Sequence, residues 1–278
     1  CGGAAVSHTR KPAAFLRSRW FGRLSVFAFL LAMWELAAMY SGLSPLLLPR
    51  VETVVAALWA GLFHGELLAQ TLFSLGMIAL GLLIGGVLAL LAAVAARLWP
   101  LADRVTDALT VMAHPLPGMA LLPLIVIWFG TGAPAVLVVI VHACVWSMLL
   151  SLQNGMRDAP PMYTDLGRTL SMSRFAVITQ ILLPAAFSQA LAGLRVGWAR
   201  AWRALIGAEM VFGAIGATGG LGWFIFKQRA MMNTPGLFAG ILLVTAVGMA
   251  VEGLVFDPLE RRTLRKWNGM AHGEGERA

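Results

Sequence analysis

Three charged residues, Arg200, Arg203 and Glu209, lie inside a stretch of chain that is otherwise rich in apolar side chains. On a helix Arg200 and Arg203 share one face, and Glu209, a further turn and a half along, returns to within about 120° of that face. A charge buried in lipid costs several kcal/mol unless it faces water or a partner. These residues therefore form either a polar stripe that faces a translocation path or a structural ion pair within a helix bundle.

Three further charged residues near the ends of apolar stretches are interpreted as structural. Arg195 is expected to form an ion pair within the bundle or to extend its side chain to the membrane surface. Glu35 and Glu252 are single acids, expected to be paired or interfacial rather than substrate ligands.

The sequence His114-Pro115-Leu116-Pro117-Gly118 cannot form a regular helix, because each proline removes a backbone donor and bends the segment before it. A broken helix inside a membrane is tolerated where protein or a water-filled cavity supplies the missing hydrogen-bond partners. The break therefore indicates either a segment that lines a path or a packing kink.

The sequence lacks the motifs of soluble catalytic sites. Its three lysines follow Arg, Phe and Arg, so the Gly-Lys pair of a phosphate-binding loop is missing and the chain cannot be its own ATPase. No His precedes a Glu, and there is no Gly-x-Ser-x-Gly elbow, which excludes two hydrolase patterns. Two cysteines provide neither a disulfide framework nor a thiolate metal cluster. We therefore predict no catalytic residue, no metal site and no cofactor in this chain.

The elements that must hold these residues are membrane-spanning helices. The 278 residues are 59% hydrophobic and 12% charged, whereas charged residues make up about a quarter of a soluble domain. A helix needs about 20 apolar residues to cross the hydrocarbon layer, and charge-free runs of that length recur along this chain. Val51–Phe63 has helical apolar spacing but is too short to cross, and is expected on the membrane surface or against the bundle. We predict an all-α integral membrane protein with six transmembrane helices, at Phe21–Tyr40, Thr71–Leu98, Ala108–Phe129, Ala135–Leu152, Pro184–Phe212 and Leu237–Phe256.

The basic residues record the topology. The chain has 21 Lys and Arg against 13 Asp and Glu, which in a soluble protein would suggest nucleic-acid binding. Lys and Arg in short loops accumulate on the cytoplasmic side of a membrane. With the amino terminus inside, fifteen basic residues fall on the cytoplasmic side and three on the outer side. Both termini are therefore predicted to be cytoplasmic, and no nucleic-acid partner is expected.

The predicted cytoplasmic loop between the fourth and fifth spans, about residues 155–184, combines polar composition with helical apolar spacing. Pro160 and Pro161 are expected to open a first short helix, and Ser173 to cap a second one. The segment is either a solvated connection or a helix-turn-helix that seats in a partner. The apolar residues at helical spacing are Met162, Leu166, Leu170, Phe175, Val177, Ile178 and Ile181.

The spacing in this loop resembles that of the inner-membrane permease subunits of bacterial ABC importers. Their loop has an acidic residue, two small residues, three of any kind, a Gly and nine more residues before Ile, any residue, Leu and Pro. Here Asp165, Leu166 and Gly167 occupy the first three positions, and Ser171 stands at the Gly position, where a side chain makes a positive φ less comfortable. The final motif follows after nine residues as Ile181-Leu182-Leu183-Pro184.

The resemblance extends from about Leu48 to Trp267 and is to the branch that serves sulfonates, taurine, nitrate and related small molecules. Each matching segment is weak alone, and together they are specific. The segments are Leu48-Pro49-Arg50-Val51-Glu52-Thr53-Val54, Leu122-Pro123-Leu124-Ile125-Val126-Ile127-Trp128-Phe129-Gly130, Ala192-Gly193-Leu194-Arg195, Gly207-Ala208-Glu209-Met210, Ala239-Gly240-Ile241-Leu242-Leu243 and Leu259-Glu260-Arg261-Arg262.

The resemblance implies a type I ABC importer permease fold and a set of partners. The loop is then a coupling helix seated in a cleft of a separate ATPase, and two permease copies, expected to be identical, enclose the path. Two ATPase subunits bind ATP and Mg, a periplasmic binding protein delivers the solute, and the complex lies in the lipid bilayer of the bacterial inner membrane. The residues expected at the ATPase are Met162, Asp165, Leu166, Gly167, Arg168, Leu170, Ser171, Ile181, Leu183 and Pro184.

The expected function is the translocation of a small anionic solute, and the alternative is a stand-alone secondary transporter or channel. A secondary transporter would typically show more spans or an inverted repeat, and a membrane-embedded enzyme would need a catalytic cluster. The expected organisation is a basic tail at 1–20, a permease domain at 21–257 and a cytoplasmic tail at 258–278. The residues expected along the path are His114, Pro115, Pro117, Arg200, Arg203 and Glu209.

Overall fold

The computed structural model describes residues 12–213 and 219–261, with side chains from Ser25 onward. Every regular element in these ranges is a helix, which confirms the all-α prediction. The long helices are α1 (Pro12–Tyr40), α3 (Leu67–Leu98), α6 (Ala133–Arg157), α10 (Phe187–Phe212) and α12 (Thr234–Val251). The shorter ones are α2 (Val51–Phe63), α4 (Pro100–Ala113), η1 (Gly118–Leu121), α5 (Leu122–Phe129), α7 (Pro161–Thr169), α8 (Arg174–Val177), η2 (Ile178–Leu182), α9 (Leu183–Ala185), α11 (Leu221–Ala230) and η3 (Glu252–Phe256).

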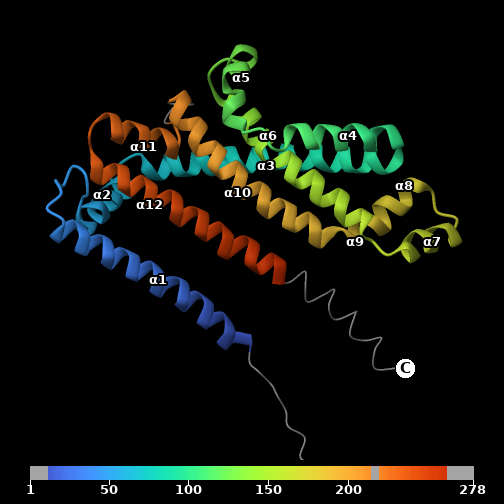
Figure 1. Ribbon diagram of the computed structural model, residues 1–278, viewed down its shortest axis with the longest axis horizontal. Helices are drawn as coiled ribbons and strands as arrows, with labels where there is room; N and C mark the ends of the chain where they lie inside the picture. Colours follow the sequence, from blue (N-terminus) through green and yellow to red (C-terminus); the bar gives the residue numbers. More distant parts are fainter. Residues whose placement is uncertain (1–11, 214–218, 262–278) are drawn as a thin grey trace, which may run out of the picture.

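The long helices run roughly along one axis and place their connections at the two ends of the molecule. Figure 1 shows α2 and α11 gathered at one end, and α7, α8 and α9 at the opposite end. The helix α5 stands out sideways from the bundle, and α1 lies along its edge (Figure 1). The loop singled out in the sequence therefore projects from one end of the bundle.

Five of the six predicted spans coincide with stretches that can cross a membrane. Three stretches qualify by length and composition, α3, α6 and Thr234–Arg261, and two bent helix pairs raise the number to as many as five. The described apolar part of α1, Ser25–Tyr40, is shorter than a span requires. The first span, and the side on which each terminus lies, stay predictions.

The third predicted span is not a straight helix. The helix α4 begins at Pro100, earlier than the predicted start at Ala108, and the pair formed by α4 and Gly118–Phe129 is bent by 91°. Pro115 and Pro117 lie at the bend, where they cannot donate the hydrogen bonds that would continue α4. The expected break at this motif is confirmed.

The fifth predicted span also begins later than expected. The segment Arg174–Ala185 and α10 are bent by 67° relative to each other, so the long helix begins at Phe187 instead of Pro184. Proline removes a backbone donor and its ring crowds the preceding turn. Just before it, η2 has π-helical hydrogen bonds, which mark an interruption of the regular helix.

The packed centre of the bundle is α6, which lies against α3 on one side and α10 on the other. Small residues let these helices approach closely, as is usual between membrane helices. A Cβ at Gly85 of α3 would lie 2.5 Å from the sulfur of Cys144. On the other side, a Cβ at Gly193 of α10 would lie 2.5 Å from the Cβ of Ser151. The helices that carry the predicted polar residues are therefore held rigidly against α6.

Candidate coupling surface and translocation path

The helix α7 is terminated at both ends by local sequence features. Pro160 and Pro161 stand at its N-cap and first position, where a missing N–H costs nothing. At its C-terminal end the N–H of Ser171 donates to the carbonyl of Arg168, and the N–H of Met172 to that of Gly167, both at 2.9 Å. This pair of bonds is a Schellman motif, which satisfies the last carbonyls of the helix.

The Schellman motif places Ser171 in the left-handed region, with a φ of +53°. This is the position where the resembling permeases have Gly, which adopts such a φ without a Cβ clash. For an L residue with a side chain the left-handed conformation costs about 1 to 2 kcal/mol. The joint between α7 and α8 is therefore formed in the expected place, at an energetic cost that a glycine would avoid.

The second arm of the helix-turn-helix begins with a capped turn. The Oγ of Ser173 accepts a hydrogen bond of 3.2 Å from the N–H of Ala176, which confirms the predicted cap. The helix α7 lies against this arm through Gly167, which is buried and where a Cβ would lie 2.6 Å from a methyl of Val177 and 3.6 Å from Ile181. Gly167 is thus the contact that lets the two arms pack.

The apolar stripe of α7, formed by Met162, Leu166 and Leu170, is exposed on the surface of the molecule. The exposed fractions of Met162, Leu166 and Leu170 are 67%, 51% and 62%. Asp165 and Arg168 form an exposed ion pair of 3.5 Å beside the stripe, which contributes at most about 1 kcal/mol. The structure therefore offers an apolar helix face at the end of the bundle that no described part of this chain covers.

The remaining residues expected at the ATPase lie where the second arm turns into α10. Leu182 is buried, Ile181 and Leu183 are half-buried, and Pro184 is exposed at the bend. These residues form the hinge between the second arm and α10, and, apart from Pro184, they expose less of their surface than the stripe does. The stripe and this hinge are brought to the same end of the molecule (Figure 1).

Glu209 is fully buried near the end of α10, in a network that crosses three helices. The hydroxyl of Ser74 donates to its two oxygens at 2.7 and 3.0 Å, and the N–H of Gly222 donates at 2.8 Å. The same hydroxyl accepts a hydrogen bond of 2.9 Å from the N–H of Leu221. Because these N–H groups belong to the first turn of α11, Glu209 and Ser74 together cap that helix.

The structure separates the three charged residues that the sequence placed on one face. The guanidinium of Arg203 is exposed and donates to the carbonyl of Ala199 at 3.0 Å, so it is not the partner of Glu209. Arg200 is half-buried and lies close enough to His114 for the two to interact electrostatically. His114 is half-buried at the break after α4, and Pro115 and Pro117 are exposed there. Their roles along a path stay predictions.

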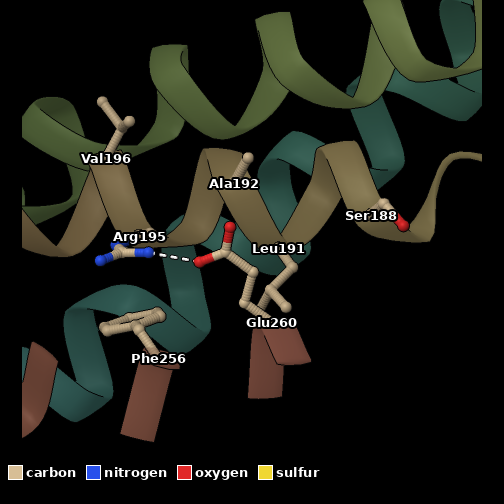
Figure 2. A pocket seen from close by; sticks show the side chains of 7 residues that line it. All are labelled: Ser188, Leu191, Ala192, Arg195, Val196, Phe256 and Glu260. Atoms are coloured by element: carbon tan, nitrogen blue, oxygen red, sulfur yellow. Dashed lines mark hydrogen bonds and ion pairs between the residues drawn. The ribbon is translucent and has the colours of Figure 1, made fainter. Parts of the chain in front are cut away.

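Arg195 forms a charge cluster that sequence reasoning only partly anticipated. From α10 it reaches Glu252, Asp257 and Glu260, with a hydrogen bond of 2.5 Å from its Nε to Glu252 and an ion pair of 3.1 Å to Asp257. Figure 2 shows Arg195 pointing toward Glu260 with Phe256 beside it, at a cavity of about 200 Å³. An ion pair was one of two expectations for Arg195, and pairing one of two for Glu252, with no partner named for either; in the structure the two pair with each other. The other two acids were missed, because acids some sixty residues away along the chain give no local signal.

Within the described ranges, no group of three or more His, Cys, Asp or Glu side chains is arranged to hold a metal ion. The candidate site consists of the exposed face of α7 and a set of polar residues between helices.

The chain is similar in sequence to several transport permeases. It is 27% identical to the putative aliphatic sulfonates transport permease protein SsuC of Bacillus subtilis, over 95% of this chain and 94% of that protein. It is 29% identical to the taurine transport system permease protein TauC of Escherichia coli, over 88% of this chain and 89% of that protein. It is 27% identical to the bicarbonate transport system permease protein CmpB of Synechococcus elongatus, over 67% of this chain and 66% of that protein.

A solved structure shares the fold. A chain of the MetNI methionine ABC transporter superposes with a TM-score of 0.55 at 16% identity, covering 71% of this chain and 96% of that one. The sequence model of the family described as binding-protein-dependent transport system inner membrane component matches residues 81–265. This range includes the α7 stripe and Arg200. The chain belongs to this family of binding-protein-dependent transport system inner membrane components.

Proposed function

We propose that this chain is the permease subunit of an ATP-driven importer that carries a small oxyanion across the bacterial inner membrane. The family supports a permease, and the names of its relatives, which are sulfonate, taurine and bicarbonate permeases, support the solute class. The small anions expected from the sequence are sulfonates, taurine, nitrate or similar, and bicarbonate extends that set.

The observation that carries the proposal is the uncovered apolar stripe on α7. Met162, Leu166 and Leu170 are more than half exposed on a helix that is fixed at both ends. Complete burial of one such side chain is worth about 1.5 to 3 kcal/mol, so seating the three in a cleft yields roughly 3 kcal/mol or more. A rigid helix with this face is suited to pass on the motion of a partner.

The partner with that role is a separate ATPase. The sequence has no phosphate-binding loop of its own, so ATP and Mg are bound by the partner and this chain has no enzymatic activity. Two ATPase subunits would then flank two copies of the permease, with Arg168 at the rim of the cleft. The copies are proposed to be identical, and a periplasmic binding protein would deliver the solute at the end that carries α2 and α11.

The test is a charge placed on the stripe. The double variant Leu166→Glu, Leu170→Glu should release the ATPase or abolish solute-stimulated ATP hydrolysis in the reconstituted complex. Gln180→Glu is the matched control, since it adds a charge at an exposed position of η2 outside the stripe with little change in shape.

The measurements are co-purification of the ATPase and stimulated hydrolysis in lipid nanodiscs. The control should behave like the wild type. A double variant that still binds the ATPase and hydrolyses ATP on stimulation would contradict the proposed seat of α7. A wild-type complex that purifies without any ATPase would favour the stand-alone transporter.

A further inference from the structure

The break between α4 and α5 lies against two of the packed helices of the bundle. The short helix η1 contacts both α6 and α10. A Cβ at Gly118 would lie 3.6 Å from the Nδ1 of His142 on α6, and the side chain of Met119 lies against Gly207 on α10. The break therefore brings His114, α6 and α10 to one place, well inside the long helices.

Three nitrogen atoms around this place are buried without a hydrogen-bond partner. They are the Nδ1 of His114, the Nδ1 of His142 and the Nε1 of Trp146. The rings of His142 and Trp146 are 6.2 Å apart at an angle of 75°, one helical turn apart on the same face of α6. A buried polar group left unpaired costs about 1 to 3 kcal/mol, and such groups are uncommon in native proteins. Three such nitrogen atoms within one region indicate that another molecule or ion binds there.

Arg200 supplies an uncompensated positive charge at the same place. It lies near the middle of α10 and interacts electrostatically with His114. Within the described part of the chain it makes no hydrogen bond or ion pair, in contrast to Arg195, which has three carboxylate partners, and Arg203, which donates to a backbone carbonyl. A lone guanidinium inside a membrane bundle marks a substrate or ion pathway by default.

We propose that Arg200, His114, His142 and Trp146 form a recognition site for the transported oxyanion, halfway along the bundle. This proposal rests on the proposed function and adds the place and the chemistry of solute selection. The guanidinium balances one negative charge, and its donors match two oxygens of a sulfonate, carboxylate or bicarbonate group. The indole N–H is only a donor, so it selects a solute with an acceptor oxygen.

The site predicts which solutes pass. An anion with two or three oxygens on one centre can accept from Arg200, Trp146 and the histidines at once. A cation of the same size meets an unbalanced positive charge and is rejected. A neutral amide cannot balance the guanidinium, so it binds more weakly than the anion. The selectivity thus comes from charge and acceptor geometry together.

The experiment uses the complete complex with its ATPase and binding protein in proteoliposomes, with taurine, methanesulfonate, bicarbonate and nitrate as probes. Arg200→Met should lower uptake of the best anion at least tenfold while ATPase binding is retained. Trp146→Phe keeps the ring and removes only the N–H, and should lower uptake severalfold. Arg104→Met is the control, because it also removes a charge, but from an exposed side chain near the start of α4 that is not among the residues expected along the path, and it should change uptake less than twofold.

The pattern across anions separates recognition from a structural role. Trp146→Phe and His142→Gln should change the relative uptake of methanesulfonate and nitrate, because the two anions place their oxygens differently. A purely structural defect would lower all anions by the same factor and would overturn the proposal. If Arg200→Met does not assemble, these two variants decide alone.

Two results distinguish a failure of the recognition site from a failure of the proposed permease function. If the wild type imports one of the four solutes and all site variants transport it as Arg104→Met does, the recognition site is refuted and the permease function stands. If the wild type assembles with its ATPase and imports none of the four solutes, the oxyanion solute and the site are both refuted.

Discussion

Replacing Glu209 by alanine removes the acceptor of a buried hydrogen-bond network and should unfasten α11 from α10. The carboxylate accepts from the hydroxyl of Ser74 and from the N–H of Gly222, and it is itself fully buried. In Glu209→Ala these two donors remain in place with no acceptor. The variant therefore tests whether Glu209 is chiefly a structural residue, as its surroundings indicate, or lines the path.

The expected loss of stability follows from the number of groups left unpaired. Each buried donor without a partner costs about 1 to 3 kcal/mol, so the two together cost about 2 to 6 kcal/mol. Glu209→Gln keeps one carbonyl oxygen as an acceptor and should lose about half as much. Arg203→Ala removes an exposed charge from the same helix. Because this side chain is not buried, the free energy of unfolding should change by less than about 0.5 kcal/mol.

The assay is thermal unfolding in detergent together with uptake by the reconstituted complex. The midpoint should fall in the order wild type, Glu209→Gln, Glu209→Ala, and uptake should fall only as far as folded complex is lost. A stable Glu209→Ala complex with abolished uptake would refute the structural reading and return Glu209 to the path.

Three further changes test other contacts of the fold. Ser171→Gly removes the side chain at a φ of +53°, a gain of about 1 kcal/mol, and should slow hydrogen exchange in α7; faster exchange would contradict the Schellman motif. Arg195→Ala leaves three carboxylates without their shared cation, so a protease should cut the segment after α12 sooner than in the wild type. An unchanged digestion pattern would show that the Arg195 charge cluster does not hold this segment. Gly85→Leu forces a side chain onto Cys144 and should lower the yield of folded protein, while Gly76→Leu, with open space within 4 Å, should not; equal yields would refute close packing at this contact.

The features of the fold that depend on local composition could be predicted from the sequence. Long charge-free runs gave five of the predicted spans, because crossing lipid requires length and apolarity that any window reveals. The break at His114 and the cap at Ser173 follow from residues that alter the backbone locally. The α7 stripe was visible because apolar residues at helical spacing in a polar segment need a partner.

The features that sequence reasoning missed depend on contacts between distant segments. The sequence left Glu209 open between a place on the path and a structural pair, because its partners, Ser74 and the start of α11, lie in other helices. Arg203, with which it could have formed an ion pair, is exposed, since spacing along a helix does not fix which side of the helix faces the bundle. The bend of 91° after α4 could be located from its prolines, but its size is set by packing on α6 and α10.

If the stripe of α7 touches the ATPase, a photo-crosslinking side chain at position 166 should react with that subunit. Placed in the complete complex in native membranes, it should form an adduct with the ATPase that depends on assembly. The same side chain at Leu47, which is exposed a few residues before α2, should form none, because α2 lies at the opposite end of the bundle from α7 (Figure 1). An ATPase adduct from position 47, or none from position 166 in an assembled and active complex, would contradict the proposed contact between α7 and the ATPase.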